Sequence, residues 1–397
     1  MARLKVLHPG LQTSVQDAGR LGHEHLGITV GGHLDDYAAA WANRLLDNPP
    51  GSAVLEITLL GPELQALDGG WLALAGADLR ALIGDRPWPP GSSRNLRAGE
   101  QVRFAGVKRG ARAYLALSGG IQVAEVFGSR STDLSAKFGG FKGRCLEAGD
   151  VLTYPGLPAH PRLAPVETCL WRETVRILPG VHLDRFPATA WERLLGTDFQ
   201  VSQHSDRVGI RLEGTPLTDK GLTADTISEA LAIGSIEAAP SGELLILLKS
   251  RGSIGGYPTV AHVIRADWPV LAQLKPGDTV RFQAVSRQQA RAAWQEQQNR
   301  LKLTPRELPA AGGAPGHGSP PRRIAVTAPV GGVLHLTAPS AAGQRVQVGH
   351  LVALLEVSQQ FYDLESPVAG TVVVTYFGEG TSVETGTVLM EVETDAP

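Results

Sequence analysis

The nine residues LRAGEQVRF at positions 96–104 have a close counterpart in LKPGDTVRF at positions 274–282. In each copy a glycine next to an acidic residue is typical of a tight turn, and the alternation that follows is typical of a half-buried strand. A shorter version of the turn, AGDVL, lies at positions 148–152. Because the two long copies occupy similar places in two stretches of similar size, we predict two β-barrel domains in tandem.

The composition favours a globular protein that is mainly β. The chain has 397 residues, with 43% hydrophobic and 19% charged residues, 47 glycines and 27 prolines. A formal net charge of -2 leaves no basic surplus for nucleic acid. The two cysteines, Cys145 and Cys169, form no disulfide framework or zinc cluster and suit a reducing compartment. With neither a secretory signal nor a membrane span in view, we expect a cytoplasmic protein.

Three windows have helical periodicity, at about residues 35–46, 186–195 and 286–303. Strand-like runs separated by glycines surround the first two. These runs lie at residues 53–57, 71–74, 101–104, 113–117, 208–212, 243–248 and 279–282.

We therefore divide the chain into four parts. The last part has an internal repeat, in which APVGGV at 328–333 is echoed by SPVAGTV at 366–372, and this predicts a small flattened barrel. Residues 306–321 are rich in Pro, Gly and Ala and are predicted to be a flexible linker. The four parts are a first barrel at 1–165, a second barrel at 166–285, a helix and linker at 286–322, and the small barrel at 323–397.

The small barrel resembles a biotinyl/lipoyl carrier domain. Such domains present their modified lysine on a tight hairpin, in a Glu-Ala-Met-Lys-Met pattern followed by an Ala-Pro-x-x-Gly turn. The corresponding stretch here is EVSQQFYDL at 356–364, and the lysine position falls on Gln359. A carboxamide cannot be acylated by a biotin ligase, and residues 323–397 contain no lysine at all. We expect no covalent biotin on this chain, which leaves docking or a relic as the role of the tail.

A series of motifs covers most of the two predicted barrels. They are GLQTSVQDAGRLG (10–22), GGHLD (31–35), ANRL (42–45), LEIT (55–58), LAGAD (74–78), ALSGGI (116–121), GSRSTDL (128–134), SDRVGIRL (205–212) and GGYP (255–258). In this order they resemble the family of the C-type subunit of 5-oxoprolinase. The family also includes allophanate hydrolase subunit 2, the carboxyltransferase part of urea carboxylase, and the antagonist of a sporulation-kinase inhibitor.

The resemblance implies a fold of two cyclophilin-like β-barrels and a role in an enzyme complex. The first expectation is a hydrolase subunit that opens 5-oxoproline to glutamate with ATP, together with a smaller B-type subunit and an A-type subunit. The first alternative is a carboxyltransferase or allophanate hydrolase subunit, and the second is a regulatory protein that binds a kinase inhibitor. No Walker-type loop is evident, so ATP is expected to bind mainly elsewhere in the complex. The histidines, His262 among them, show no metal-ligand spacing, and we predict no metal site.

Arginines in Gly- and Ser-rich turns are suited to grip a carboxylate or phosphate and to stabilise an oxyanion. Aspartates close to them in sequence could orient them or act as bases. Structural ion pairs, such as Asp17 with Arg20 or Asp206 with Arg207, are the alternative for these residues. The candidate catalytic residues are Asp17, Arg20, Arg130, Asp133 and Glu237, and the candidate substrate-binding residues are Asp35, Arg207, Arg251, Gly255, Gly256 and Tyr257.

The sequence departs from the family near this expected site. Members usually have Gly-Ser-Ile-Gln where this chain has GSIE at 234–237, and a Leu-Leu-Ala-Asp stretch where it has LLKS at 247–250. Glu237 thus replaces an amide, Lys249 is a new cation, and Ile254 replaces a threonine. These changes bear on the substrate more than on the fold.

We expect one cleft between the barrels. The residues predicted to converge there are Arg130, Asp133, Glu237, Arg251 and Tyr257. A carboxylate in such a cleft needs a partner, so Glu237 is expected to be ionised and held by one of the two arginines.

Overall fold

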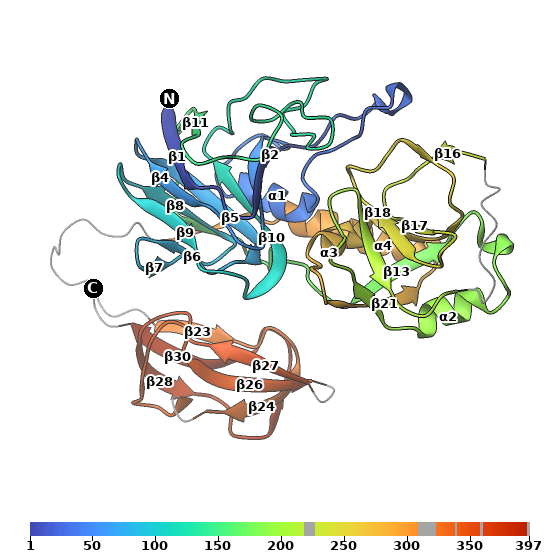
Figure 1. Cartoon of the computed structure of the whole chain (residues 1–397). Helices are drawn as coiled ribbons and strands as arrows, with labels where there is room; N and C mark the ends of the chain where they lie inside the picture. Colours follow the sequence, from blue (N-terminus) through green and yellow to red (C-terminus); the bar gives the residue numbers. More distant parts are fainter. Residues whose placement is uncertain (218–226, 309–322, 338–339, 358–359, 395–397) are drawn as a thin grey trace. The chain divides into compact units, whose positions relative to one another are not determined.

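The computed structural model describes residues 1–217, 227–308, 323–337, 340–357 and 360–394. The chain forms two compact units, Met1–Ala310 and Ala311–Pro397, which are described separately. The first unit contains two β subdomains (Figure 1). Among the described residues, no helix is both long enough and apolar enough to span a membrane.

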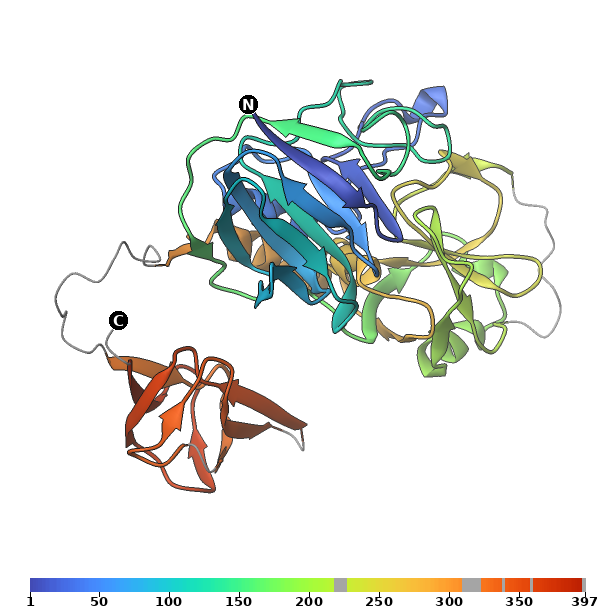
Figure 2. The same ribbon diagram turned by 60° about the vertical axis from the view of Figure 1, so that its left-hand side comes forward.

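The first subdomain consists of two sheets packed on a common core (Figures 1 and 2). One sheet has six strands in the order β11 (Val151–Tyr154), β1 (Ala2–His8), β4 (Glu63–Ala66), β9 (Gln101–Phe104), β6 (Ala81–Ile83) and β7 (Arg86–Pro87). The other has seven strands in the order β2 (Gln12–Gln16), β3 (Val54–Thr58), β10 (Arg109–Leu117), β5 (Gly70–Asp78), β8 (Ser92–Leu96), β12 (Arg162–Leu163) and β22 (Arg306–Glu307).

Strand β10 explains why this subdomain has two apolar layers. Along a strand, successive side chains point to opposite faces. Ala113, Leu115 and Leu117 therefore enter the core between the sheets, whereas Tyr114 and Ala116 face a second apolar cluster that includes helix α1 (Asp36–Arg44). Helix α1 lies within the predicted window 35–46, and its packing fixes the loop that precedes it.

The second subdomain is a closed barrel. Its strand order is β13 (Thr174–Pro179), β20 (Thr259–Val263), β17 (Ser235–Ala238), β18 (Leu244–Leu247), β15 (Gly209–Glu213), β14 (Phe199–Val201) and β21 (Thr279–Ala284). The barrel closes through parallel pairing of β13 with β21. A two-stranded flap, β16 (Glu229–Ala230) with β19 (Ile254–Gly255), lies outside this barrel. Helices α2 (Ala190–Gly196) and α3 (Trp268–Ala272) complete the subdomain.

The two copies of the repeated sequence form the same local structure in different settings. Gly99 and Gly277 have positive φ values of 88° and 85°, which suit glycine, and each precedes a strand. The strand after Gly99, β9, lies inside an open sheet, whereas the strand after Gly277, β21, closes a barrel. The prediction of a mainly β protein is confirmed, and the two β subdomains differ in their closure.

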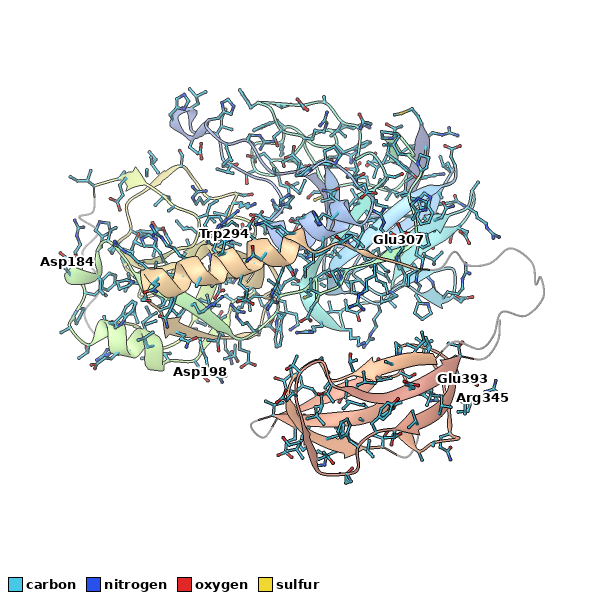
Figure 3. The ribbon with its side chains drawn as sticks, turned by 180° about the vertical axis from the view of Figure 1, so that it is seen from behind. Asp184, Asp198, Trp294, Glu307, Arg345 and Glu393 are labelled. Atoms are coloured by element: carbon cyan, nitrogen blue, oxygen red, sulfur yellow. The ribbon has the colours of Figure 1, made fainter. Side chains whose placement is uncertain are left out.

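Helix α4 (Arg287–Lys302) belongs to the first unit and contacts both of its subdomains (Figure 3). A capping box at Ser286 begins it. The Gln297 amide donates to the Ala266 carbonyl of the second subdomain, and Arg44 of the first subdomain donates to the Leu303 carbonyl just after the helix.

Residues 306–321 were expected to form a flexible linker, but Arg306 and Glu307 pair with β12 as strand β22. The linker prediction was therefore wrong at its start, because these residues complete a sheet; residues 309–322 lie outside the described part.

The second unit is a small sandwich of two four-stranded sheets. They are β23 (Arg323–Thr327), β30 (Val388–Thr394), β28 (Gly370–Thr375) and β25 (Arg345–Val346), and β27 (Gln360–Glu365), β26 (Leu351–Val357), β24 (Gly332–Leu336) and β29 (Thr381–Val383). Val357 pairs with Gln360, so two residues connect β26 to β27. Gln359, predicted at the lysine position, is one of these two and lies outside the described residues.

Candidate functional site

Asp17 follows β2 and holds the loop at residues 128–132. Its carboxylate accepts hydrogen bonds from the Ser129 and Ser131 hydroxyls (2.6 and 2.5 Å) and from the backbone N–H groups of Gly19 and Arg130 (2.9 and 2.5 Å). Burial opposes ionisation, but these hydrogen bonds outweigh it and lower the pKa of Asp17. The predicted catalytic Asp17 is thus a saturated carboxylate that organises a loop, and it is poorly suited to act as a base.

Arg20 lies beneath the same loop and is 1% exposed. Its Nη2 donates to the Ser131 carbonyl, and its guanidinium lies 4.7 Å from the centre of the Phe138 ring. Burial lowers the pKa of Arg20, while the charges of Asp133 and Asp17 oppose this shift. Nε and Nη1 have no hydrogen-bond partner within the described structure. Arg20 is therefore a buried cation with unused donors.

Arg130 and Asp133 lie close to this loop but are engaged by other groups. The Arg130 guanidinium pairs with Glu125 (2.9 Å), so only its backbone N–H reaches Asp17. Asp133 accepts from the Thr29 hydroxyl (2.8 Å) and from the backbone N–H groups of Ser135 and Ala136 (3.1 and 2.9 Å). Asp133 thus accepts three hydrogen bonds, one fewer than Asp17.

A set of charged groups joins the two subdomains next to this loop. We call Asp36, His33, Lys249 and Arg265 the Asp36 cluster. The Lys249 ammonium and the Arg265 guanidinium of the second subdomain both bind the Asp36 carboxylate, and His33 Nδ1 lies 3.0 Å from it. Burial disfavours the Asp36 charge, but Lys249 and the other partners outweigh burial and hold the pKa of Asp36 well below its usual range.

Lys249 is the functional candidate that the sequence did not assign to the site. Its side chain is 7% exposed, and burial lowers the pKa of its ammonium while Asp36 opposes that shift. The Lys249 carbonyl also accepts from the Gly31 N–H (3.0 Å). Its departure from the family pattern was the only signal in the sequence.

Asp35 and Arg207, expected to bind substrate, are used inside the protein. Asp35 caps α1 through the Ala38 N–H and also accepts from Gln273 (2.6 Å). Burial is the main cause that raises the pKa of Asp35 to about 7. Arg207 pairs with buried Glu56 and donates to the Gly32 carbonyl. Both side chains make contacts between the two subdomains, and their assignment to substrate binding stays a prediction.

The flap carries the remaining substrate-binding candidates. Arg251 donates through Nε and Nη2 to the Leu231 carbonyl (3.0 and 2.7 Å). Burial lowers the pKa of Arg251, and the charge of Glu24 in the first subdomain opposes this shift. Gly255 pairs with Glu229 in the flap, and Tyr257 is 43% exposed. Gly256 lies between Gly255 and Tyr257, so these residues border solvent.

Glu237 differs from its prediction. It is 3% exposed, and its Oε1 has no hydrogen-bond partner in the described structure. Burial, with a further contribution from Glu229, raises the pKa of Glu237 to about 7. The expected arginine partner is wrong, because Arg130 pairs with Glu125 and Arg251 binds a backbone carbonyl.

The five residues predicted to share a cleft fall into two groups. Arg130 and Asp133 border the Asp17 loop, whereas Glu237, Arg251 and Tyr257 lie near the flap. The first group is connected to the second subdomain through backbone contacts, since the Asp17 carbonyl accepts from the His33 N–H (2.9 Å) and the Lys249 carbonyl accepts from the Gly31 N–H (3.0 Å). Their convergence on one cleft stays a prediction.

Comparisons with known proteins identify the family to which the two subdomains belong. Residues 26–284 match the family described as carboxyltransferase domain, subdomain A and B. The chain belongs to this family. The match includes the Asp36 cluster, the flap and Glu237, but it ends before α4 and the second unit.

The carboxyltransferase domain is also shared with named relatives. The chain is 35% identical to the C-type subunit of the 5-oxoprolinase of Escherichia coli over 299 residues, which are 74% of this chain and 95% of the relative. It is 30% identical to the urea amidolyase of Lachancea kluyveri over 315 residues, covering 72% of this chain and 17% of that protein.

A solved structure, the urea carboxylase of Kluyveromyces lactis, covers 91% of this chain and 34% of its own, with 28% identity and a TM-score of 0.70. Because 91% of the chain exceeds the 310 residues of the first unit, this alignment includes part of the second unit. The chain therefore spans about a third of that protein.

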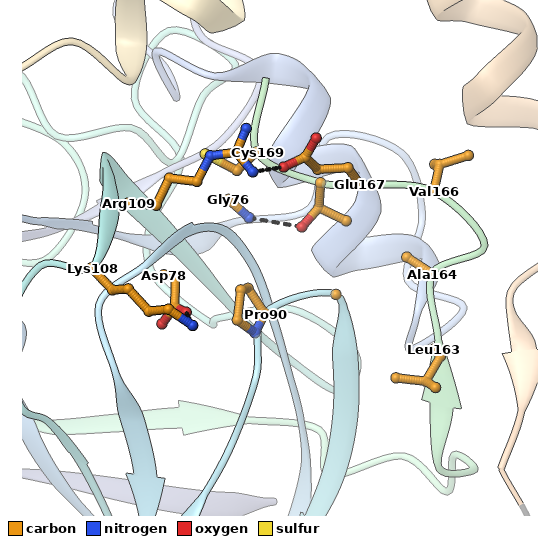
Figure 4. Close-up of a pocket in the computed structure, with 12 residues that line it drawn as sticks. Gly76, Asp78, Pro90, Lys108, Arg109, Leu163, Ala164, Val166, Glu167 and Cys169 are labelled. Carbon is orange, nitrogen blue, oxygen red and sulfur yellow. Dashed lines mark hydrogen bonds and ion pairs between the residues drawn. The ribbon is translucent and has the colours of Figure 1, made fainter. Parts of the chain in front are cut away.

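A separate pocket of about 410 Å³ opens on the first subdomain (Figure 4). Two ion pairs, Lys108 with Asp78 (3.5 Å) and Arg109 with Glu167, line it. The buried Cys169 thiol also lines it, and burial raises the pKa of this thiol to about 12. None of the predicted site residues lines this pocket, and its charged groups are already paired.

Proposed function

We propose that the chain is the C-type subunit of an ATP-dependent amide hydrolase that opens 5-oxoproline to glutamate. It would act with a smaller B-type subunit of similar barrel design and with an A-type subunit. The similarity to the C-type subunit of the Escherichia coli 5-oxoprolinase, over 95% of that relative, supports this proposal. ATP is the expected second substrate of the complex, and we assign no residue of this chain to it.

The Asp36 cluster is the observation that carries the proposal. Two cations, Lys249 and Arg265, share one carboxylate, so the cluster has a surplus of positive charge. The side chains of Asp36 and Arg265 are 26% and 38% exposed, which leaves the cluster accessible to a ligand. A carboxylate such as that of 5-oxoproline is an anion that this surplus would attract.

The role of Lys249 is tested by the Lys249→Met variant, assayed in the complex co-purified from the native host. We expect the KM for 5-oxoproline to rise about tenfold, with a smaller change in kcat, because the lost charge binds the substrate rather than the transition state alone. Lys302→Met, at the exposed end of α4, is the matched control. An unchanged KM in Lys249→Met would remove the cluster from the site.

A carboxyltransferase or allophanate hydrolase subunit is the second candidate function. The urea carboxylase alignment supports it, since that similarity includes part of the second unit. The same purified complex should be assayed for ATP-dependent turnover of both 5-oxoproline and allophanate. Turnover of allophanate alone favours the second candidate, and turnover of neither refutes both.

We further propose that the second unit is a biotinyl-like domain that carries no biotin. The tight connection between β26 and β27 supports the domain type, and the absence of lysine from residues 323–397 supports the lack of biotin. Co-expression with a biotin ligase should give no streptavidin-positive band and no matching mass increase. A biotinylated chain would contradict the proposal.

A further inference from the structure

Three polar side chains share the outer face of the second barrel. Ile236 and Ala238 of β17 point into the barrel core, so Ser235 and Glu237 on the same strand point outward. His262 of β20 lies opposite Ser235, and its Nδ1 is 3.2 Å from the Ser235 hydroxyl. A hydroxyl, an imidazole and a carboxyl group are thus neighbours on one surface of the sheet.

A β-bulge lies at Glu237. The pairing steps from Ile236 with Ala261 to Glu237 with Thr259, so Val260 is an extra residue on β20. Val260 and Ala261 both enter the core, as a bulge allows. Bulges change the direction of a side chain and are frequent next to active sites. The local backbone therefore sets the position of the Glu237 carboxyl.

No cation binds this carboxyl group within the described structure. The neighbouring strands contribute Leu245, Thr259 and His262, the flap contributes Glu229, and the loop before the short helix at Leu183–Arg185 contributes His182. A buried polar atom without a partner is costly and needs an explanation. The free Oε1 of Glu237, in a residue that is 3% exposed, points to a ligand that supplies the missing hydrogen bond.

Glu229 is already engaged by a histidine. His182 Nδ1 accepts from the Thr259 N–H (3.1 Å), so the proton of the neutral ring lies on Nε2, which is 3.4 Å from Glu229. Glu237 has no such partner, and burial with Glu229 nearby raises its pKa to about 7. At neutral pH a large share of Glu237 therefore carries a proton.

A protonated carboxyl group offers one donor and one acceptor side by side. The amide of a lactam, held cis by its ring, presents an N–H and a C=O side by side as well. We infer that the protonated Glu237 carboxyl binds the cis-amide edge of a lactam substrate, donating to its carbonyl and accepting from its N–H. This inference rests on the proposed function and identifies the part of the substrate that Glu237 recognises. A carboxylate has no donor and would repel the lactam oxygen.

The flap provides a route to this face. Its two strands pair through Glu229 with Gly255 and Ala230 with Ile254, and next to them the Leu231 N–H donates to the Ser253 carbonyl (3.0 Å). A two-stranded pairing this short has less stability than the closed barrel, so its local opening costs less than opening of the barrel. Ile254, at its outer side, is 67% exposed and adds little packing. We therefore expect a small lactam to reach Glu237 through the flap, without unfolding of the barrel.

Calorimetric titration of the co-purified complex with 5-oxoproline from pH 6 to pH 9 tests the inference. The wild-type association constant should fall about tenfold per pH unit above pH 7, as Glu237 loses its proton. Glu237→Gln keeps one donor and one acceptor at every pH, so its binding should not change with pH. Glu237→Ala should weaken binding about tenfold at pH 6. Glu213→Gln, an exposed change on β15, is the control and should behave as wild type.

Two further ligands test whether binding depends on the cis-amide edge or on the carboxylate of 5-oxoproline. The lactam 2-pyrrolidone, which lacks the carboxylate, should show the same pH dependence with lower affinity. N-acetylglycine has the carboxylate but a trans amide, and it should bind at least tenfold more weakly than 5-oxoproline. Equal binding of N-acetylglycine, a wild-type pH dependence in Glu237→Gln, or no lactam binding at pH 6 would each overturn the inference.

The two proposals fail in distinguishable ways. If the complex opens 5-oxoproline but Glu237→Gln keeps the wild-type pH dependence, only the role of Glu237 is refuted. If the complex turns over no 5-oxoproline, the proposed function fails. Titration with 2-pyrrolidone then still decides whether Glu237 binds a lactam.

Discussion

The loop at Asp17 and the outer face at Glu237 both bury a carboxyl group that the sequence placed among the catalytic residues. Asp17 receives hydrogen bonds from two hydroxyls and two backbone N–H groups, and its pKa falls. Glu237 has an unpartnered Oε1 and an acidic neighbour, and its pKa rises to about 7. Burial acts in the same direction on both, so the number of donors decides which group is ionised. The first group fits a structural role, and the second can exchange a proton near neutral pH.

The largest expected effect comes from removing the saturated carboxylate. Asp17→Ala leaves the hydroxyls of Ser129 and Ser131 and two backbone N–H groups without their acceptor. We expect the free energy of unfolding of the first unit to fall by about 4 kcal/mol. Urea denaturation followed by tryptophan fluorescence measures it. Asp68→Asn, at an exposed pair with Arg3, is the control and should change little; an equally small loss in Asp17→Ala would break the comparison.

A smaller, pH-dependent effect of opposite sign is expected at Glu237. Its pKa is raised in the folded state, from 4.5 to about 7, so the folded state binds more protons between these values. The contribution of Glu237 to the free energy of unfolding is therefore largest below pH 4.5, and it is lost as the pH rises to about 7. Glu237→Gln should make the protein more stable than wild type at pH 8, by up to about 3 kcal/mol, with no gain at pH 4.5.

Thermal and urea unfolding at both pH values measure this difference. Glu213→Gln on the same barrel should show no such pH dependence. A Glu237→Gln variant that is less stable than wild type at pH 8 would mean that the carboxylate has a partner, which contradicts the contrast with Asp17.

The smallest effect is expected at Asp133, which has an intermediate set of donors. Thr29→Val removes the hydroxyl donor but leaves the backbone N–H groups of Ser135 and Ala136 on the carboxylate. The loss should be about 1 kcal/mol in the free energy of unfolding, because only one hydrogen bond disappears. Thr29→Ser keeps the hydroxyl and should retain most of the stability. A loss as large as that of Asp17→Ala would show that the number of hydrogen-bond donors does not determine how much stability is lost.

Much of the fold could be predicted because its signals are local. The alternation in residues 113–117 and the turn at Gly277 depend on neighbours in the chain, and β10 and β21 formed there. The roles of Asp17 and Asp35 could not be predicted, since their partners lie far along the sequence: Ser129 for Asp17, and Gln273 for Asp35.

The candidate site was predictable only in part for the same reason. Lys249 meets Asp36 across 213 positions, and no sequence pattern connects them. The replacement of the family's glutamine by an acidic residue drew attention to Glu237, but the sequence could not show that its neighbours bring no cation. The arginine partner was inferred from a general rule about buried charge. In this protein Glu237 needs no arginine, because a bound proton can neutralise the buried carboxyl group instead.

The closure of the second barrel also restricts how partners can attach. Each of the seven barrel strands is paired on both sides, so the barrel offers no free edge for an added strand. The six-stranded sheet of the first subdomain ends in β11 at one side and in β7 at the other. Strand β7 has two residues, Arg86 and Pro87, and such a short, charged, proline-containing border resists extension. At the other border the Thr153 carbonyl of β11 accepts from the Gln122 N–H (2.9 Å), so the chain itself already occupies part of that edge.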